Sequence, residues 1–149
     1  MSQMAKIEVS TVINRPIEEV FAVLSNEENR SKWSSTTIEV KKTSEGPIGV
    51  GTTWRGVDRI FGRQMERESV YTEYERNRKV TQKSTSGPVP FVVQFIYEPT
   101  ARGTRVIIIA EAQPSGLFKL AGPLLMRLRK RQFARDLANL KAMIEAHAF

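Results

Sequence analysis

Alternation of apolar and polar positions opens the chain and predicts a β-strand over residues 6–14. One face of this strand carries only β-branched residues, which favour an extended backbone. Pro16 interrupts the alternation and suits the first position of a helix. A Ser-x-x-Glu capping box at residues 25–28 predicts a second short helix that runs to Trp33. The apolar positions between these two signals have helical spacing: Ile17, Val20, Phe21 and Leu24.

Six further stretches in the middle of the chain predict β-strands. They are rich in β-branched and aromatic residues, and clusters of glycine, proline or asparagine separate them. Short connections between consecutive strands indicate an antiparallel meander. The six predicted strands cover residues 36–42, 52–59, 64–74, 79–84, 91–98 and 104–112.

Helical spacing returns near the C-terminus and predicts a long helix that begins near Pro123. We expect residues 117–125 to form a lid and residues 133–144 to pack on the sheet. At about 100° per residue, one side of the helix collects the apolar positions that would face the sheet. These positions are Met126, Phe133, Leu137, Leu140 and Ile144.

The composition of the 149-residue chain excludes several kinds of site. There is no cysteine, which rules out disulfides, thiolate nucleophiles and cysteine-ligated zinc. The single histidine, His147, stands next to the C-terminus, so most catalytic triads and histidine-rich metal sites are excluded. We expect one domain over residues 1–149, with no metal and no cofactor. Without an apolar span or a secretory signal, a cytoplasmic location is expected.

The net charge of +7 is concentrated in the C-terminal segment. A solvated helix face is the ordinary interpretation of such a segment. The alternative is peripheral contact with an anionic surface. A nucleic-acid partner is not favoured, because exposed aromatic residues do not accompany the charges. The basic residues of the candidate surface are Arg127, Arg129, Lys130 and Arg131.

Several stretches resemble one known family. They are residues 13–21 with Leu24 and Trp33, Gly49-Val50-Gly51-Thr52, residues 70–75, Thr104-Arg105-Val106 and residues 136–141. With them, the chain resembles the START-like superfamily, in its SRPBCC branch of polyketide cyclases/dehydrases and lipid-transport proteins. The resemblance implies an α+β helix-grip fold, in which a curved seven-stranded antiparallel sheet wraps around a long C-terminal helix. Two short helices follow the first strand.

The resemblance also implies a cavity between sheet and helix that holds lipids, polyketides, sterols or isoprenoid quinones. Tyr97-Glu98-Pro99 is similar to the family's Phe-Glu-Pro strand ending, which implies that Tyr97 faces inward. Strand parity then places other side chains on the same inner face. The predicted cavity residues are Trp33, Trp54, Val70, Tyr74, Gln82, Val93, Phe95, Tyr97, Ile108, Leu120, Met126 and Phe133.

Three functions are compatible with these residues. We favour non-catalytic binding of a hydrophobic or amphipathic small molecule. The first alternative is a polyketide cyclase or dehydratase, for which Asp58 and Glu68 are the candidate general acid or base. The same carboxylates also fit a solvated position, paired with Arg55, Arg63 or Arg67. The second alternative is an interaction protein whose basic helix contacts RNA, a ribosome or an anionic membrane.

Overall fold

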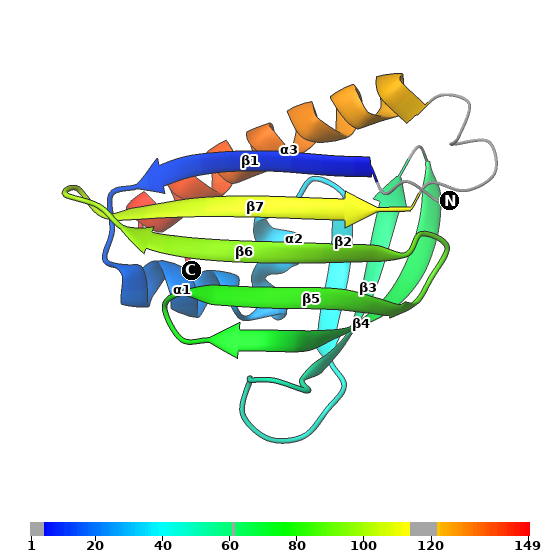
Figure 1. Cartoon of the computed structure of the whole chain (residues 1–149), viewed down its shortest axis with the longest axis horizontal. Coiled ribbons are helices and arrows are strands. Elements are labelled where there is room, and N and C mark those ends of the chain that lie inside the picture. Colours follow the sequence, from blue (N-terminus) through cyan, green and yellow to red (C-terminus); the bar gives the residue numbers. More distant parts are fainter. Residues whose placement is uncertain (1–4, 61, 114–121) are drawn as a thin grey trace.

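The computed structural model in Figure 1 describes residues 5–60, 62–113 and 122–149. Strand β1 (Ala5–Ile13) opens the chain, and the long helix α3 (Gly122–Glu145) closes it. Three short helical elements follow β1: α1 (Ile17–Leu24), the 3-10 helix η1 (Glu27–Asn29) and α2 (Arg30–Trp33). The remaining strands are β2 (Thr37–Lys42), β3 (Thr53–Ile60), β4 (Arg63–Glu75), β5 (Lys79–Ser86), β6 (Phe91–Pro99) and β7 (Thr104–Ala112).

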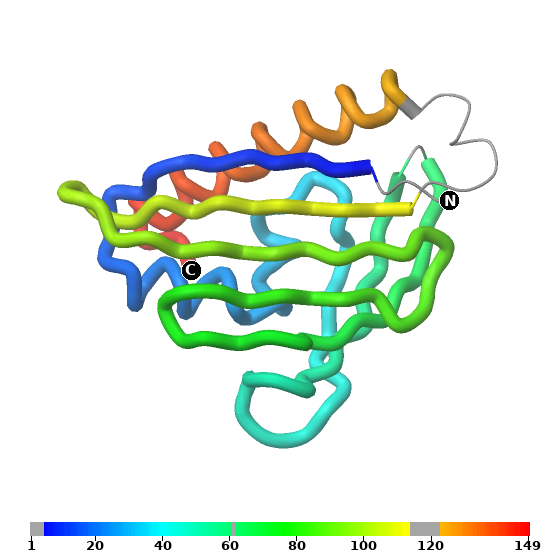
Figure 2. The backbone as a smooth tube through the Cα atoms, in the orientation of Figure 1, coloured from blue at the N-terminus to red at the C-terminus, as the bar shows by residue number. Residues whose placement is uncertain are grey.

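The seven strands form one antiparallel sheet in the order β1-β7-β6-β5-β4-β3-β2. The predicted strands and their antiparallel arrangement are therefore confirmed. Figure 2 shows how strongly the sheet curls, because β2 and β3 run steeply across the direction of β5, β6 and β7. Helix α3 packs against β1 and contacts α2. The curl and the helix together enclose the concave face of the sheet.

The predicted capping box at residues 25–28 is wrong. Ser25 ends α1, where its backbone N–H donates to the Phe21 carbonyl. Asn26 is the residue that caps η1, because its side-chain oxygen accepts a hydrogen bond from the Glu28 N–H at 3.1 Å. Asn and Ser satisfy free N–H groups equally well at a helix start, so the sequence motif selected the wrong neighbour.

A bulge in β4 overturns part of the predicted strand parity. The pairing of β4 with β5 shifts between Tyr71 and Glu73, so Thr72 is an extra residue. Tyr71 and Tyr74 therefore both reach the core, and their rings stack at 6.2 Å. Val70 was predicted to face inward with Tyr74, but it lies between the buried residues Ser69 and Tyr71, on the opposite face.

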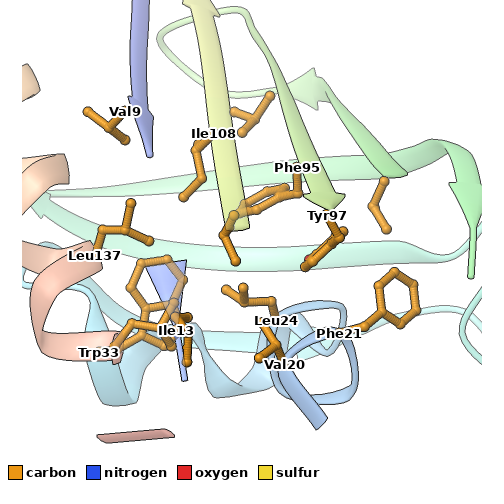
Figure 3. Close-up of a cluster of buried hydrophobic side chains, with 14 of the residues drawn as sticks. Val9, Ile13, Val20, Phe21, Leu24, Trp33, Phe95, Tyr97, Ile108 and Leu137 are labelled. Atoms are coloured by element: carbon orange, nitrogen blue, oxygen red, sulfur yellow. The ribbon is translucent and has the colours of Figure 1, made fainter. Parts of the chain in front are cut away.

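The hydrophobic core gathers at the end of the sheet where β1 ends and β7 begins. Figure 3 shows how α1 contributes Val20, Phe21 and Leu24 to the core residues of the strands. From the C-terminal half of α3 come Leu137, Leu140 and Ile144, each at most 2% exposed. The N-terminal half of the same helix differs, since Leu124 is 61% exposed. Residues 117–121 of the predicted lid lie outside the described residues.

In the part of the chain that the structure describes, no helix is long and apolar enough to cross a membrane. The long helix instead mixes buried apolar residues on one side with charged residues on the other. Such a distribution is typical of a helix that covers one face of a sheet.

Two core tyrosines make the stability of the fold depend on pH. Burial raises the pKa of both Tyr71 and Tyr97 well above the ordinary value. The Tyr71 hydroxyl donates to the Ser25 carbonyl at 2.8 Å. The Tyr97 hydroxyl has no hydrogen-bond partner among the described residues, and its ring meets Phe21 edge-on at 5.0 Å. Both hydroxyls therefore stay protonated in the folded protein at neutral pH.

We expect the free energy of unfolding to fall as the pH rises above about 10, where unfolded tyrosine ionises and the folded residues do not. The Tyr97→Phe substitution should flatten this slope by up to about 1.4 kcal/mol per pH unit. It should change stability little at neutral pH, because no hydrogen bond of the Tyr97 hydroxyl is lost. Urea denaturation of both proteins from neutral to alkaline pH measures the slopes. Identical slopes would contradict the assignment.

Candidate functional site

A cavity of about 520 Å³ lies between the concave face of the sheet and the N-terminal half of α3. It occupies the end of the sheet opposite the core, where β1 begins and β7 ends. Apolar surface from both layers forms most of its wall, and polar and charged side chains lie between the apolar ones. The apolar residues include Ala5, Ile7, Ile60, Met65, Phe91, Val93, Ala110, Leu125, Met126 and Phe133.

The predicted cavity residues divide into three groups. The wall contains Trp33, Gln82, Val93, Met126 and Phe133. Strand parity had indicated which face of the sheet each side chain takes, but not which end of the sheet encloses the cavity. Val70 lies on the outer face of the sheet, and Leu120 lies outside the described residues. Residues that pack in or against the closed core, away from the cavity wall, are Trp54, Tyr74, Phe95, Tyr97 and Ile108.

A largely buried ion pair joins Asp58 and Arg67 on the cavity wall. The Arg67 Nε donates to the Asp58 carboxylate at 2.6 Å, and their side chains are 14% and 16% exposed. The Thr37 hydroxyl donates to the same carboxylate at 3.0 Å. Gly56, opposite Arg67 in the sheet, makes room for the pair, because a Cβ there would lie 2.6 Å from the Arg67 Cζ. Asp58 thus faces the cavity, as strand parity predicted.

Glu68, the other candidate general acid or base, does not reach the cavity. It is exposed and shares the outer face of β4 with Val70. The bulge at Thr72 explains this placement, because Glu68 and Tyr74 would share a face only if β4 were regular. His147 lies at the exposed C-terminal end, 3.6 Å from the Glu19 carboxylate. Among the described residues, no cluster of three or more acidic, histidine or cysteine side chains could hold a metal ion.

A second buried ion pair, Glu27 with Arg30, was missed by sequence reasoning. The Arg30 Nη2 donates to the Glu27 carboxylate at 2.7 Å, and the Glu27 side chain is 1% exposed. The guanidinium also lies over the rings of Trp33 and Phe95, at 4.9 Å and 5.3 Å. Burial disfavours the charged form of Arg30, but the Glu27 carboxylate, with smaller contributions from Tyr71 and Asp58, raises the pKa of Arg30.

Arg129 is not part of the basic surface to which the sequence assigned it. Arg127, Lys130 and Arg131 are exposed, whereas Arg129 is half-buried and lines the cavity. Its Nη1 donates to the Gln132 side-chain oxygen at 2.7 Å, and its guanidinium lies 5.2 Å from the Phe133 ring centre. Burial lowers the pKa of Arg129, and the positive charges of Arg30 and Arg67 act in the same direction.

Comparison with known proteins supports the predicted relationship. Residues 4–145 match the family described as polyketide cyclase / dehydrase and lipid transport. No curated protein sequence matches the chain. A solved structure from Thermus thermophilus, TTHA0849, has a TM-score of 0.83 at 17% identity and covers 97% of this chain and 100% of its own.

Two further solved structures are similar over nearly the whole chain. The Zhui aromatase/cyclase from a Streptomyces species has a TM-score of 0.81 at 15% identity, covering 99% of this chain and 97% of its own. A START superfamily protein from Mycobacterium smegmatis has a TM-score of 0.79 at 12% identity, covering 97% and 99%. At such identities the similarity establishes the fold alone, and it confirms the helix-grip prediction.

The Glu27–Arg30 pair generates a stability prediction. The Glu27→Gln substitution should lower the free energy of unfolding by about 3 kcal/mol, because it leaves the Arg30 cation buried without its counterion. Glu28→Gln is the matched control, since Glu28 is exposed, and it should cost no more than about 0.5 kcal/mol. Urea denaturation at neutral pH measures both. Equal, small losses would show that Arg30 does not depend on Glu27.

Proposed function

The chain belongs to the polyketide cyclase / dehydrase and lipid transport family, and we propose that it binds a hydrophobic or amphipathic small molecule between the sheet and α3. The observation that carries this proposal is the cavity of about 520 Å³. Pockets that bury a small molecule have volumes of about 300–1,000 Å³ and predominantly apolar walls. The cavity has both properties.

The two halves of α3 contribute differently to the concave face, and this difference supports binding at the cavity. The C-terminal half of the helix fills the concave face with Leu137, Leu140 and Ile144. The N-terminal half spans the same face but only lines the cavity, with Met126 and Phe133. A ligand there would bury apolar surface on both layers, which is the dominant favourable term in binding such molecules.

Binding needs only an enclosed apolar surface, whereas catalysis also needs a side chain that can accept or donate a proton. The carboxylate of Asp58 already accepts hydrogen bonds from Arg67 and Thr37, so its oxygens are engaged within the protein. Tyr71 and Tyr97 do not line the cavity, and burial raises the pKa of both hydroxyls. Non-catalytic binding is therefore the function that the geometry supports best.

Filling the cavity should abolish binding without unfolding the protein. Ala110 lines the cavity from β7, whereas its neighbour Ile109 points to the other face of the strand. We expect Ala110→Phe to weaken binding of the neutral dye Nile red by about tenfold or more, because the ring would occupy the space of the ligand. A fluorescence titration measures the affinity.

Ile109→Phe is the matched control, because it adds an aromatic ring to the same strand on the outer face. It should leave the affinity for Nile red within about twofold of the wild type. Thermal unfolding of both variants verifies that they remain folded. If Ala110→Phe binds the dye as well as the wild type does, the binding site lies elsewhere.

A second candidate function is a cyclase or dehydratase, favoured by the position of Asp58 and Arg67 on the cavity wall. In such a reaction the Asp58 carboxylate would take a proton from a carbon next to a ketone, and Arg67 would polarise the ketone oxygen. The enolate carbon then attacks a second ketone carbon of the same molecule, and the oxygen of that ketone takes the proton back from Asp58 as its C=O double bond becomes a C–O single bond. This hydroxyl leaves as water together with a further α-proton, and a C=C bond forms. The similarity to the Zhui aromatase/cyclase is one of fold and does not transfer its reaction.

This candidate predicts that the wild-type protein converts a poly-β-ketone thioester into a product lighter by one water molecule. Asp58→Asn should slow that conversion by about a hundredfold, while Nile red still binds. Glu68→Gln, on the outer face, is the control and should react normally. Mass spectrometry of the reaction mixtures measures the product. No water loss with the wild type would contradict the candidate.

The remaining sequence-based hypotheses stay predictions. The exposed residues Arg127, Lys130 and Arg131 keep the basic surface available for an anionic surface or RNA. No other feature of the described residues favours such a partner over the cavity ligand. The cytoplasmic location also stays a prediction.

A further inference from the structure

We infer that the ligand of the cavity is an amphipath with a carboxylate group, which Arg129 binds while the apolar part lies between the sheet and α3. This inference rests on the proposed function and names the chemical class of its ligand. It follows from three observations: how the arginines of the cavity are paired, where Arg129 lies, and what surrounds it.

Three arginines of the described residues line the cavity, and two of them have carboxylate partners. Arg30 pairs with Glu27 at 2.7 Å, and Arg67 pairs with Asp58 at 2.6 Å. Among the described residues, no carboxylate lies within 4.0 Å of Arg129. The residues outside the described ranges contain no aspartate or glutamate. The chain therefore supplies a counterion to every cavity arginine except Arg129.

The neighbours of Arg129 orient the side chain but do not neutralise it. Gln132 accepts one N–H of the guanidinium at 2.7 Å, and the Phe133 ring lies 5.2 Å from the guanidinium carbon. Gln132 in turn donates to the Asp136 carboxylate at 3.4 Å, and the Ser35 hydroxyl donates to the same carboxylate oxygen. Asp136 is thus one residue removed from the guanidinium and engaged with other donors.

The electrostatic environment makes this cation costly. Burial lowers the pKa of Arg129, and the charges of Arg30 and Arg67 lower it further, although Asp58 and Asp136 oppose them. Arg30, which has its own carboxylate, shows the opposite shift. A buried cation without a counterion is stabilised by any anion that reaches it. A carboxylate fits this position, because two parallel hydrogen bonds match the planar guanidinium fork.

The surroundings of Arg129 fit an amphipath rather than a small polar anion. Met126 and Phe133 flank Arg129 on the cavity side of the helix, three positions before it and four after it. Across the cavity, Phe91, Val93 and Ala110 provide an apolar sheet surface. A ligand whose charged group binds Arg129 can therefore place its apolar part against the adjoining apolar wall.

Decanoate and decanol are matched probes, because they share an alkyl chain and differ in the charged group. Isothermal titration calorimetry should show that the wild type binds decanoate at least about tenfold more tightly than decanol. Arg129→Gln should weaken decanoate binding by about tenfold or more and leave decanol binding within about twofold. Arg129→Lys keeps the charge and should retain part of the preference for decanoate.

Arg127→Gln is the matched control, because it removes an equal charge from the exposed side of the same helix. It should leave both affinities unchanged. Comparable binding of the two probes by the wild type, or an unchanged preference in Arg129→Gln, would overturn the inference and leave the proposed function intact. Failure of the wild type to bind either probe would count against the proposed function itself, and the inference would fall with it.

Discussion

The architecture depends on one constraint: a single long helix has to cover the concave face of a seven-stranded, strongly curled sheet. Only its C-terminal half fits closely, where Leu137, Leu140 and Ile144 are nearly inaccessible to solvent and α1 adds Phe21 and Leu24. The N-terminal half leaves space between itself and the sheet, and this space is the cavity. Packing at one end of the helix therefore fixes the fold, while incomplete packing at the other end provides the site.

Most of the arginines on the cavity wall are paired with carboxylates. Glu27 with Arg30 and Asp58 with Arg67 bring ionised side chains onto the wall of an apolar space, and each pair offsets the desolvation of its members. Arg129 departs from this arrangement, because its partner is the neutral amide of Gln132. In a wall where the other arginines are neutralised, an arginine left with an unshared charge gives the cavity a preference among ligands. Shape and apolar area alone do not provide such a preference.

Much of the fold was predictable because its signals are local. Pro16, the alternating strands and the helical spacing after Pro123 placed the elements correctly, and the parity of β3 placed Asp58 toward the interior. The bulge at Thr72 was not predictable, because an extra residue in one strand leaves no mark in its apolar pattern. The cavity was harder still. Phe95 and Val93 share a face of β6, but only the tertiary packing decides that Phe95 lies under Arg30, away from the cavity, while Val93 lines it. The i,i+3 spacing of Glu27 and Arg30 was a usable signal, as was the place of Arg129 between Met126 and Phe133.

The most direct test of the central claim, that a small molecule binds between the sheet and the N-terminal half of α3, is nuclear magnetic resonance of the backbone amides during a titration with decanoate. The largest chemical-shift changes should map to strands on both sides of the cavity and to the helix that covers it, at Ile7, Gln82, Val93, Ala110 and Phe133. Changes confined to the outward side of α3, at Leu124, Leu128 and Arg131, would contradict the account, because they would place the ligand on the exposed surface of the helix.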